Sequence, residues 1–240
     1  MAGASGGYAG DMPRAFQTRH GQRSRAPQRR QVQLPREVVD DVRQTARPAQ
    51  AQEAISHLER AVDLLSRGDS RQAAKEAQRA KAGAPRSAAV REVLGLAYYG
   101  AEQWRDTLRE MQAYRRMTGR QDQNHIIADA YRALGSPDKA VPLAEEALRA
   151  RIPPDAKSEA VVVAASALAD LGRFDEALAL LRRLPSRSDV GRSQDLRVWY
   201  VTGDIMAKAG RREDAAREFR RITRHDPTAF DAAERLAELA

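Results

Sequence analysis

A signature of small and apolar residues recurs about every 34 residues between Ala54 and Pro227. Five copies align, and they begin near residues 54, 88, 121, 158 and 196. In each copy, a segment of helical periodicity ends near a glycine and a second such segment follows. One helix pair of this size cannot bury its apolar face alone, so neighbouring pairs have to stack. The repeat therefore predicts an all-α chain of stacked helix-turn-helix units.

The fifth copy shows the fullest form of the signature. It carries Trp199, Gly203, Ala215, Phe219 and Pro227 at its repeat positions. These residues and their spacing resemble the tetratricopeptide repeat, whose pattern is W-x2-L-G-x2-Y, then A-x3-F, then P. The resemblance implies a right-handed helical solenoid of about five repeats that works by binding other proteins.

Small residues occupy two positions of nearly every copy. The eighth position holds Ala61, Gly95, Ala128, Ala165 and Gly203. The twentieth position holds Ala73, Thr107, Ala140, Ala177 and Ala215. We expect the two helices of each unit to cross at these positions, because small side chains allow the backbones to approach closely. A larger residue there should cost roughly 1–3 kcal/mol through overpacking.

The repeats predict a domain of residues 48–240. We place the units near 54–87, 88–120, 121–157, 158–195 and 196–229. The amphipathic stretch 228–240 is expected to form a capping helix, because the last unit of a solenoid has an apolar edge to cover.

A short amphipathic segment precedes the repeats, within residues 35–47. Pro35 stands at its start, and Val38, Val39, Val42 and Ala46 share one stripe. A helix this short is marginal alone. It either covers the apolar edge of the first repeat or presents a motif to a partner.

Pro142 conflicts with the helix predicted around it. Ser136 is expected to cap this helix and Pro137 to be its first residue. Pro142 follows five residues later and lacks an amide hydrogen, so the pattern predicts a kink.

Residues 1–34 are predicted to be a disordered basic tail, because they are rich in Gly, Ser, Gln and Arg and hold few large apolar groups. Residues 1–36 contain seven arginines and one aspartate, a net charge of +6, against +2 for the rest of the chain. The tail either contacts phosphates of RNA or DNA or only aids solubility. The arginines proposed for phosphate contact are Arg14, Arg19, Arg23, Arg25, Arg29 and Arg30.

The family resemblance also implies where a partner binds, because the first helix of each repeat lines a concave groove. The groove residues implied here are Glu92, Tyr99, Asp122, His125, Asp129, Arg132, Glu159, Arg197, Tyr200 and Asp204. Chaperone-binding members carry Lys, Asn and Arg in this groove, whereas this chain carries mostly acids and aliphatics. The expected ligand is therefore a peptide or helix of another protein, and not the terminal carboxylate of a chaperone.

Other sites are excluded or disfavoured by what the sequence lacks. It has no cysteine, which excludes disulfides and thiolate ligands. Its four histidines never occur at i, i+4, and no glycine-rich phosphate loop appears. His125 shares a helix face with Asp122 and Asp129, which an ion-pair network explains better than chemistry does. We expect no catalytic residue, no metal and no cofactor.

Location and source are expectations from composition. The longest strongly apolar run spans about six residues, where a membrane span needs roughly twenty, and the start lacks the apolar core of a signal peptide. A cytoplasmic location is therefore expected. Arginine supplies 36 of the 41 basic residues, and with abundant alanine the chain resembles the repeat proteins of high-GC bacteria. The alternative function is a nucleic-acid- or ribosome-associated factor that uses the arginine-rich tail.

Overall fold

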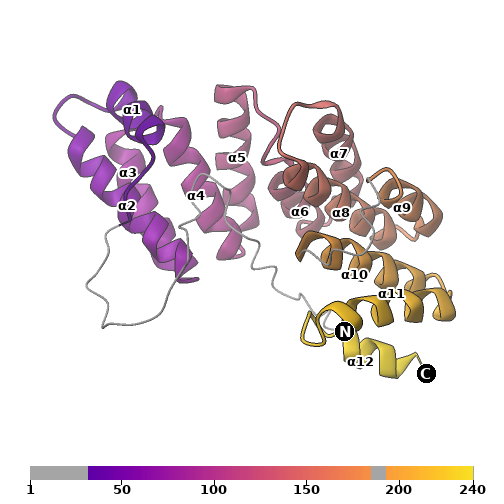
Figure 1. Ribbon diagram of the computed structural model, residues 1–240. Helices are drawn as coiled ribbons and strands as arrows, with labels where there is room; N and C mark the ends of the chain where they lie inside the picture. The colour runs from indigo at the N-terminus through magenta and orange to yellow at the C-terminus, as the bar shows by residue number, and fades with distance from the viewer. Residues whose placement is uncertain (1–31, 185–192, 240) are drawn as a thin grey trace, which may run out of the picture. The chain divides into compact units, whose positions relative to one another are not determined.

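The computed structural model describes residues 32–184 and 193–239 (Figure 1). Helices connected by turns make up these two ranges, and no strand occurs within them. The predicted all-α, helix-turn-helix fold class is thereby confirmed. The six tail arginines proposed for phosphate contact lie outside the described residues. The chain divides into two compact units, residues 1–119 (unit 1) and 120–240 (unit 2).

Unit 1 contains the first five helices. They are α1 (Arg36–Thr45), α2 (Ala51–Ser66), α3 (Ser70–Gly83), α4 (Ala88–Gly100) and α5 (Trp104–Thr118). The helices α2 and α3 form one antiparallel pair, α4 and α5 form the next, and α3 packs against α4. The first helices of the two pairs, α2 and α4, also contact each other and α1.

Unit 2 continues the same alternation. Its helices are α6 (Asn124–Ala133), α7 (Ala140–Arg149), α8 (Pro154–Asp170), α9 (Phe174–Leu181), α10 (Ser193–Lys208), α11 (Arg212–His225) and α12 (Ala232–Glu238). A 3-10 turn, η2 (Pro137–Lys139), precedes α7. The first helices α6, α8 and α10 pack successively, α8 against α6 and α10 against α8. The short α12 packs against α11.

The predicted crossing points are tightly packed. The alanines at the eighth and twentieth positions are fully buried. A Cβ added at Gly95 would lie 2.8 Å from Cε and 2.9 Å from Cγ of Met111, closer than carbon atoms tolerate. A Cβ added at Gly203 would lie 3.2 Å from the Phe219 ring. The expected close approach of the paired helices is confirmed.

Thr107 replaces the usual alanine at one crossing without leaving its hydroxyl unsatisfied. Its side chain is fully buried. The hydroxyl donates to the carbonyl oxygen of Gln103 one turn earlier, at 3.1 Å. This hydrogen bond offsets the cost of burying a polar group.

Helix termini follow the local sequence. Gly68 has φ 78° and Gly172 has φ 73°, the left-handed conformation that glycine adopts most readily after a helix. The Asp69 carboxylate accepts a hydrogen bond from the Gln72 amide at 3.2 Å, so it caps α3. Arg115 and Arg116 lie in the last turn of α5, where positive charge complements the helix dipole.

The prediction of a kink at Pro142 was wrong. The chain instead forms the 3-10 turn η2 and begins the α-helix at Ala140. Pro142 therefore lies in the first turn of α7, where amides have no acceptor within the helix and a missing hydrogen costs little. Ser136 precedes the turn, but its side chain makes no capping hydrogen bond.

The core is built mainly from alanine and branched aliphatic side chains. In unit 1 one buried cluster extends from α1 through α4. In unit 2 a cluster around α8 includes residues of α7, α9 and α10, and a second one joins α10, α11 and α12. Across the described residues, no helix combines the length and apolarity that a membrane crossing requires.

Candidate partner-binding face

The first-helix face of unit 1 is covered by α1. Ile55, Leu58 and Val62 lie on α2, the first helix of the first pair, and all three are buried. They belong to one apolar cluster with Val38 and Val42 of α1. The expectation that this short helix covers the apolar edge of the first repeat is confirmed.

A carboxylate fixes α1 to the start of α4. Asp41 accepts hydrogen bonds from the Ser87 hydroxyl and from the Ala89 amide, the latter at 3.2 Å. The Ser87 oxygen in turn accepts from the Val90 amide at 3.1 Å and caps α4. Amides at the start of a helix lack partners within the helix and favour a negative charge. Asp41 thus occupies an anion-accepting position on α4.

Two of the implied groove residues belong to unit 1. Glu92 and Tyr99 lie on α4 and are half-buried. The Tyr99 ring packs edge-on against Trp104, with ring centroids 5.6 Å apart. The other eight implied residues belong to unit 2.

The α6 end of unit 2 carries four of the implied residues. Arg132 donates from Nη1 to Asp129 Oδ1 at 3.2 Å and from Nε to Asp170 at the end of α8. Asp122 forms an ion pair with Arg120. The carboxylates near His125 therefore pair with arginines, as the ion-pair interpretation expected.

His125 is held neutral. The ring is partly exposed, but its Nδ1 atom is enclosed. Burial lowers the pKa of His125 to about 4, the positive charge of Arg197 lowers it further, and the backbone of Asp122 partly opposes both effects. A neutral imidazole beside carboxylates suggests metal binding, yet among the described residues no group of His, Asp and Glu is arranged to hold a metal ion.

Ion pairs also connect the next first helices. Arg197 of α10 donates from Nη2 to Glu159 of α8 at 3.0 Å. Asp204 of α10 accepts from Arg235 Nη2 of α12 at 3.0 Å and from Lys208 Nζ at 2.8 Å. The side chains of Arg197, Glu159, Asp204 and Arg235 are mostly buried, whereas that of Lys208 is about half exposed.

Tyr200 links α10 to the turn before α12. Its hydroxyl donates to Asp231 Oδ1 at 2.6 Å. Its ring stacks at a tilt on Phe230, with centroids 4.8 Å apart. Burial raises the pKa of Tyr200 well above its usual value, and the Asp231 carboxylate raises it further. The hydroxyl therefore remains a hydrogen-bond donor at any physiological pH.

A single arrangement recurs over unit 2. Between α6 and α8, between α8 and α10, and between α10 and α12, an arginine on one helix meets a carboxylate on the other. We call these pairs the arginine ladder; they are Arg132 with Asp170, Arg197 with Glu159, and Arg235 with Asp204. Sequence reasoning missed Arg235 because α12 carries no repeat signature.

Comparison with known proteins identifies the fold. A family model described as Tetratrico peptide repeat matches residues 126–225. The chain has a tetratricopeptide-repeat fold. Among solved structures, it resembles TTC0263, a thermophilic TPR protein of Thermus thermophilus, with a TM-score of 0.61 and 17% identity, over 78% of this chain and 98% of that one. It also resembles YrrB, described as a TPR protein with an unusual peptide-binding site, with a TM-score of 0.53 and 20% identity, over 78% of this chain and 94% of YrrB. No curated protein matches the sequence.

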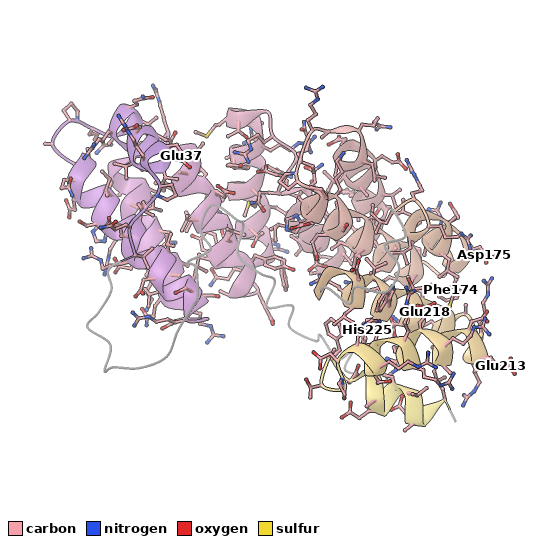
Figure 2. The ribbon with its side chains drawn as sticks, in the orientation of Figure 1. Glu37, Phe174, Asp175, Glu213, Glu218 and His225 are labelled. Atoms are coloured by element: carbon pink, nitrogen blue, oxygen red, sulfur yellow. The ribbon has the colours of Figure 1, made fainter. Side chains whose placement is uncertain are left out.

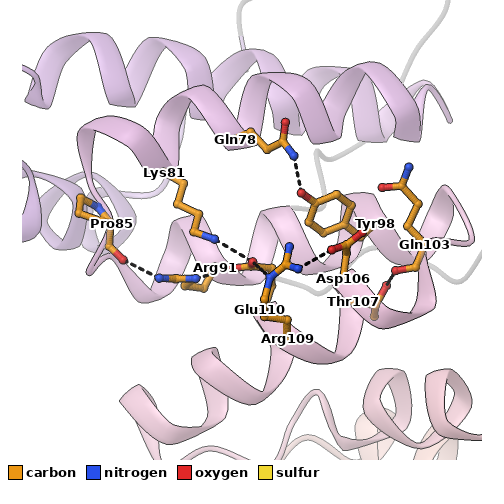
Figure 3. A network of polar contacts seen from close by, with 10 residues as sticks. All are labelled: Gln78, Lys81, Pro85, Arg91, Tyr98, Gln103, Asp106, Thr107, Arg109 and Glu110. Carbon is orange, nitrogen blue, oxygen red and sulfur yellow. Dashed lines mark hydrogen bonds and ion pairs between the residues drawn. The ribbon is translucent and has the colours of Figure 1, made fainter.

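The tetratricopeptide fold of unit 1 also encloses a charged cluster that sequence reasoning missed. Glu110 is fully buried and accepts hydrogen bonds from Lys81 Nζ at 2.8 Å, Arg91 Nη1 at 2.6 Å and Arg109 Nε at 3.0 Å (Figure 3). Burial alone would raise the pKa of Glu110, but these hydrogen bonds lower it overall. Arg109 is one of several arginines on α5. Its guanidinium pairs with Glu110 and Asp106.

Proposed function

We propose that this protein is a non-enzymatic scaffold that binds a segment of a partner protein on the first-helix face of unit 2. The arginine ladder supports the proposal most directly. It places partly exposed charges on the first helices α6, α8 and α10 and on α12. Such pairs contribute only about 0–1 kcal/mol each to stability, so a partner can exchange contacts with them at small cost to the fold.

The ladder supplies the groups that an extended peptide needs. Arg132, Arg197 and Tyr200 offer hydrogen-bond donors to carbonyl oxygens and acidic side chains. Asp129, Glu159 and Asp204 offer acceptors to peptide amides and basic side chains. His125 on α6 and Asp122, two residues before the start of α6, border this set. Glu92 and Tyr99 are proposed contacts on the first-helix face of unit 1.

The comparisons support a binding role in general terms. YrrB is described as having a peptide-binding site, and this chain shares its fold. A partner protein for this chain remains part of the proposal, as do the residues that contact it.

Site-specific photocrosslinking in the native host tests the proposal. A photoreactive amino acid is placed at Ser166 or Asp204, on the first helices α8 and α10. Matched control sites are Glu213 and Arg220, exposed on the second helix α11; Glu213 lies at its start (Figure 2). We expect the same partner to crosslink from both first-helix sites and from neither control. Crosslinks from the controls alone would refute the assignment of the face.

Charge reversal tests the residues. A variant with Asp129→Arg, Arg132→Glu and Asp204→Arg should retain less than about a tenth of the partner that crosslinks from Ser166, while removal of residues 1–31 should leave that yield unchanged. The alternative function predicts the opposite effect of removing the tail. Nucleic-acid binding by the tail should vanish on that removal, and log K should fall with log salt by about 0.7–0.9 per neutralised phosphate.

A further inference from the structure

The helix α1 occupies the face of unit 1 that corresponds to the proposed binding face of unit 2. It contacts α2 and α4, the two first helices of this unit. We propose that α1 is a built-in ligand of this face, and that an amphipathic helix of a partner protein with the same chemistry replaces it. The inference rests on the proposed function and extends it to the part of the first-helix face of unit 1 that α1 covers.

The apolar contacts of α1 define what such a partner must carry. Leu34, Val38 and Val42 follow one another at intervals of four residues and are the buried side chains of this segment. They join the cluster that contains Ile55, Leu58 and Val62 of α2. Residues four apart lie on one face of a helix. Val38 and Val42 lie on α1 and Leu34 lies two residues before its start, so a replacing segment needs aliphatic residues at i, i+4 and i+8, of which the first precedes its helix.

A carboxylate adds specificity. Asp41, seven residues after Leu34, accepts from the Ser87 hydroxyl and the Ala89 amide at the start of α4. Both donors belong to α4 and stay in place when α1 leaves. The replacing helix therefore needs an aspartate or glutamate at i+7 to satisfy them.

The attachment of α1 is slight compared with that of the repeat helices. It spans ten residues, has no side-chain cap at its start, and buries only Val38 and Val42 within its own length. Isolated helices of this length are marginal in water. Its polar residues Glu37 and Arg43 are exposed, and Asp40 is partly exposed.

The tether explains why α1 nonetheless stays docked. Residues 46–50 join α1 to α2, and a short link of this kind gives an effective concentration of order millimolar. An external helix of equal intrinsic affinity therefore competes poorly. Undocking α1 should raise the apparent affinity for such a helix by at least about tenfold.

A peptide of this chain's own residues 33–47 serves as the probe. Its binding to the full-length protein is measured by fluorescence anisotropy, for the wild type and for Val42→Asp, which places a charge at a fully buried position of α1. We expect the variant to bind the peptide at least tenfold more tightly than the wild type. The same peptide carrying Asp41→Asn should bind the variant more weakly than the unaltered peptide.

Two outcomes overturn the proposal. One is that Val42→Asp binds the peptide no better than the wild type. The other is that Val42→Asp unfolds unit 1, because α1 would then be an integral part of its core. Hydrogen exchange on the wild type gives a separate measurement: α1 amides should exchange at least tenfold faster than those of α2, and equal protection counts against a replaceable helix.

Failure here is distinguishable from failure of the proposed function. Photocrosslinks from Ser166 and Asp204 in unit 2 do not depend on the docking of α1. Their persistence alongside a negative peptide result would leave unit 2 as the binding face and assign α1 a covering role only.

Discussion

Burial shifts the pKa of individual titratable residues in this fold, and His125 is the clearest example. Its pKa of about 4 lies below the usual 6.5, because burial and the charge of Arg197 disfavour the imidazolium. In the unfolded chain the same ring takes up a proton near pH 6.5. Protons therefore bind preferentially to the unfolded state between these two values, and acid pulls the chain toward unfolding.

The free energy of unfolding should consequently decrease as pH falls from 6.5 to 4. Each pKa unit corresponds to about 1.4 kcal/mol, so His125 contributes a loss of up to about 3 kcal/mol across the window. Urea denaturation at several pH values measures it. The His125→Gln variant cannot titrate and should show a flatter profile; an unchanged slope would place the acid sensitivity elsewhere.

Glu110 shows the opposite case, an ionised carboxylate kept in the core by three cations. Glu110→Gln removes the charge and leaves Lys81, Arg91 and Arg109 without their common partner. Breaking a buried pair costs about 3–5 kcal/mol. Because Lys81 and Arg91 are partly exposed, we expect a loss of about 3 kcal/mol, at the lower end of this range. Urea denaturation at pH 7 measures it, with the exposed Glu213→Gln as the control that should change stability by less than about 0.5 kcal/mol.

Between elements, the spacing of paired helices is set by the residue at each crossing. Gly95→Val places side-chain atoms where Met111 already lies, and should destabilise unit 1 by about 1–3 kcal/mol. Ala82→Val, at an exposed position of α3, adds the same type of side chain without a clash and should cost less than about 1 kcal/mol. When Met111→Ala is combined with Gly95→Val, the loss should be smaller than the sum of the two single losses; additive losses would show that crowding is not the cause.

The sequence predicted the elements well because their determinants are local. Glycines and small residues at fixed spacing identified the helix pairs. Long-range features were less visible. In the sequence, Glu110 resembles any other charge on an amphipathic helix. Its partners Lys81 and Arg91 lie on α3 and α4 and approach it only in the folded chain. The role of Arg235 depended on α12 packing against α11, from which this arginine reaches Asp204 of α10.

At the scale of the whole molecule, the chain forms two compact units, and each contains one tryptophan. Trp104 belongs to α5 in unit 1, and Trp199 belongs to α10 in unit 2. Substituting either by phenylalanine leaves fluorescence that reports on one unit alone. Repeat proteins are stabilised chiefly by contacts between neighbouring repeats. A destabilising substitution in one unit should therefore lower the stability of that unit more than that of the other.

Combining Glu110→Gln with these reporters tests the division. The urea midpoint reported by Trp104 (in Trp199→Phe) should fall clearly. The midpoint reported by Trp199 (in Trp104→Phe) should fall by less than half as much. Equal shifts would mean that the two units unfold as one cooperative body.

The helix α12 has a consequence for building longer arrays. It makes with α10 the arginine-to-carboxylate contact that earlier first helices make with one another, so the C-terminal end already has the chemistry of an internal junction. An engineered protein could therefore be lengthened by inserting a helix pair ahead of α12. The inserted first helix would need only an arginine to meet Asp204 and an acid to receive Arg235.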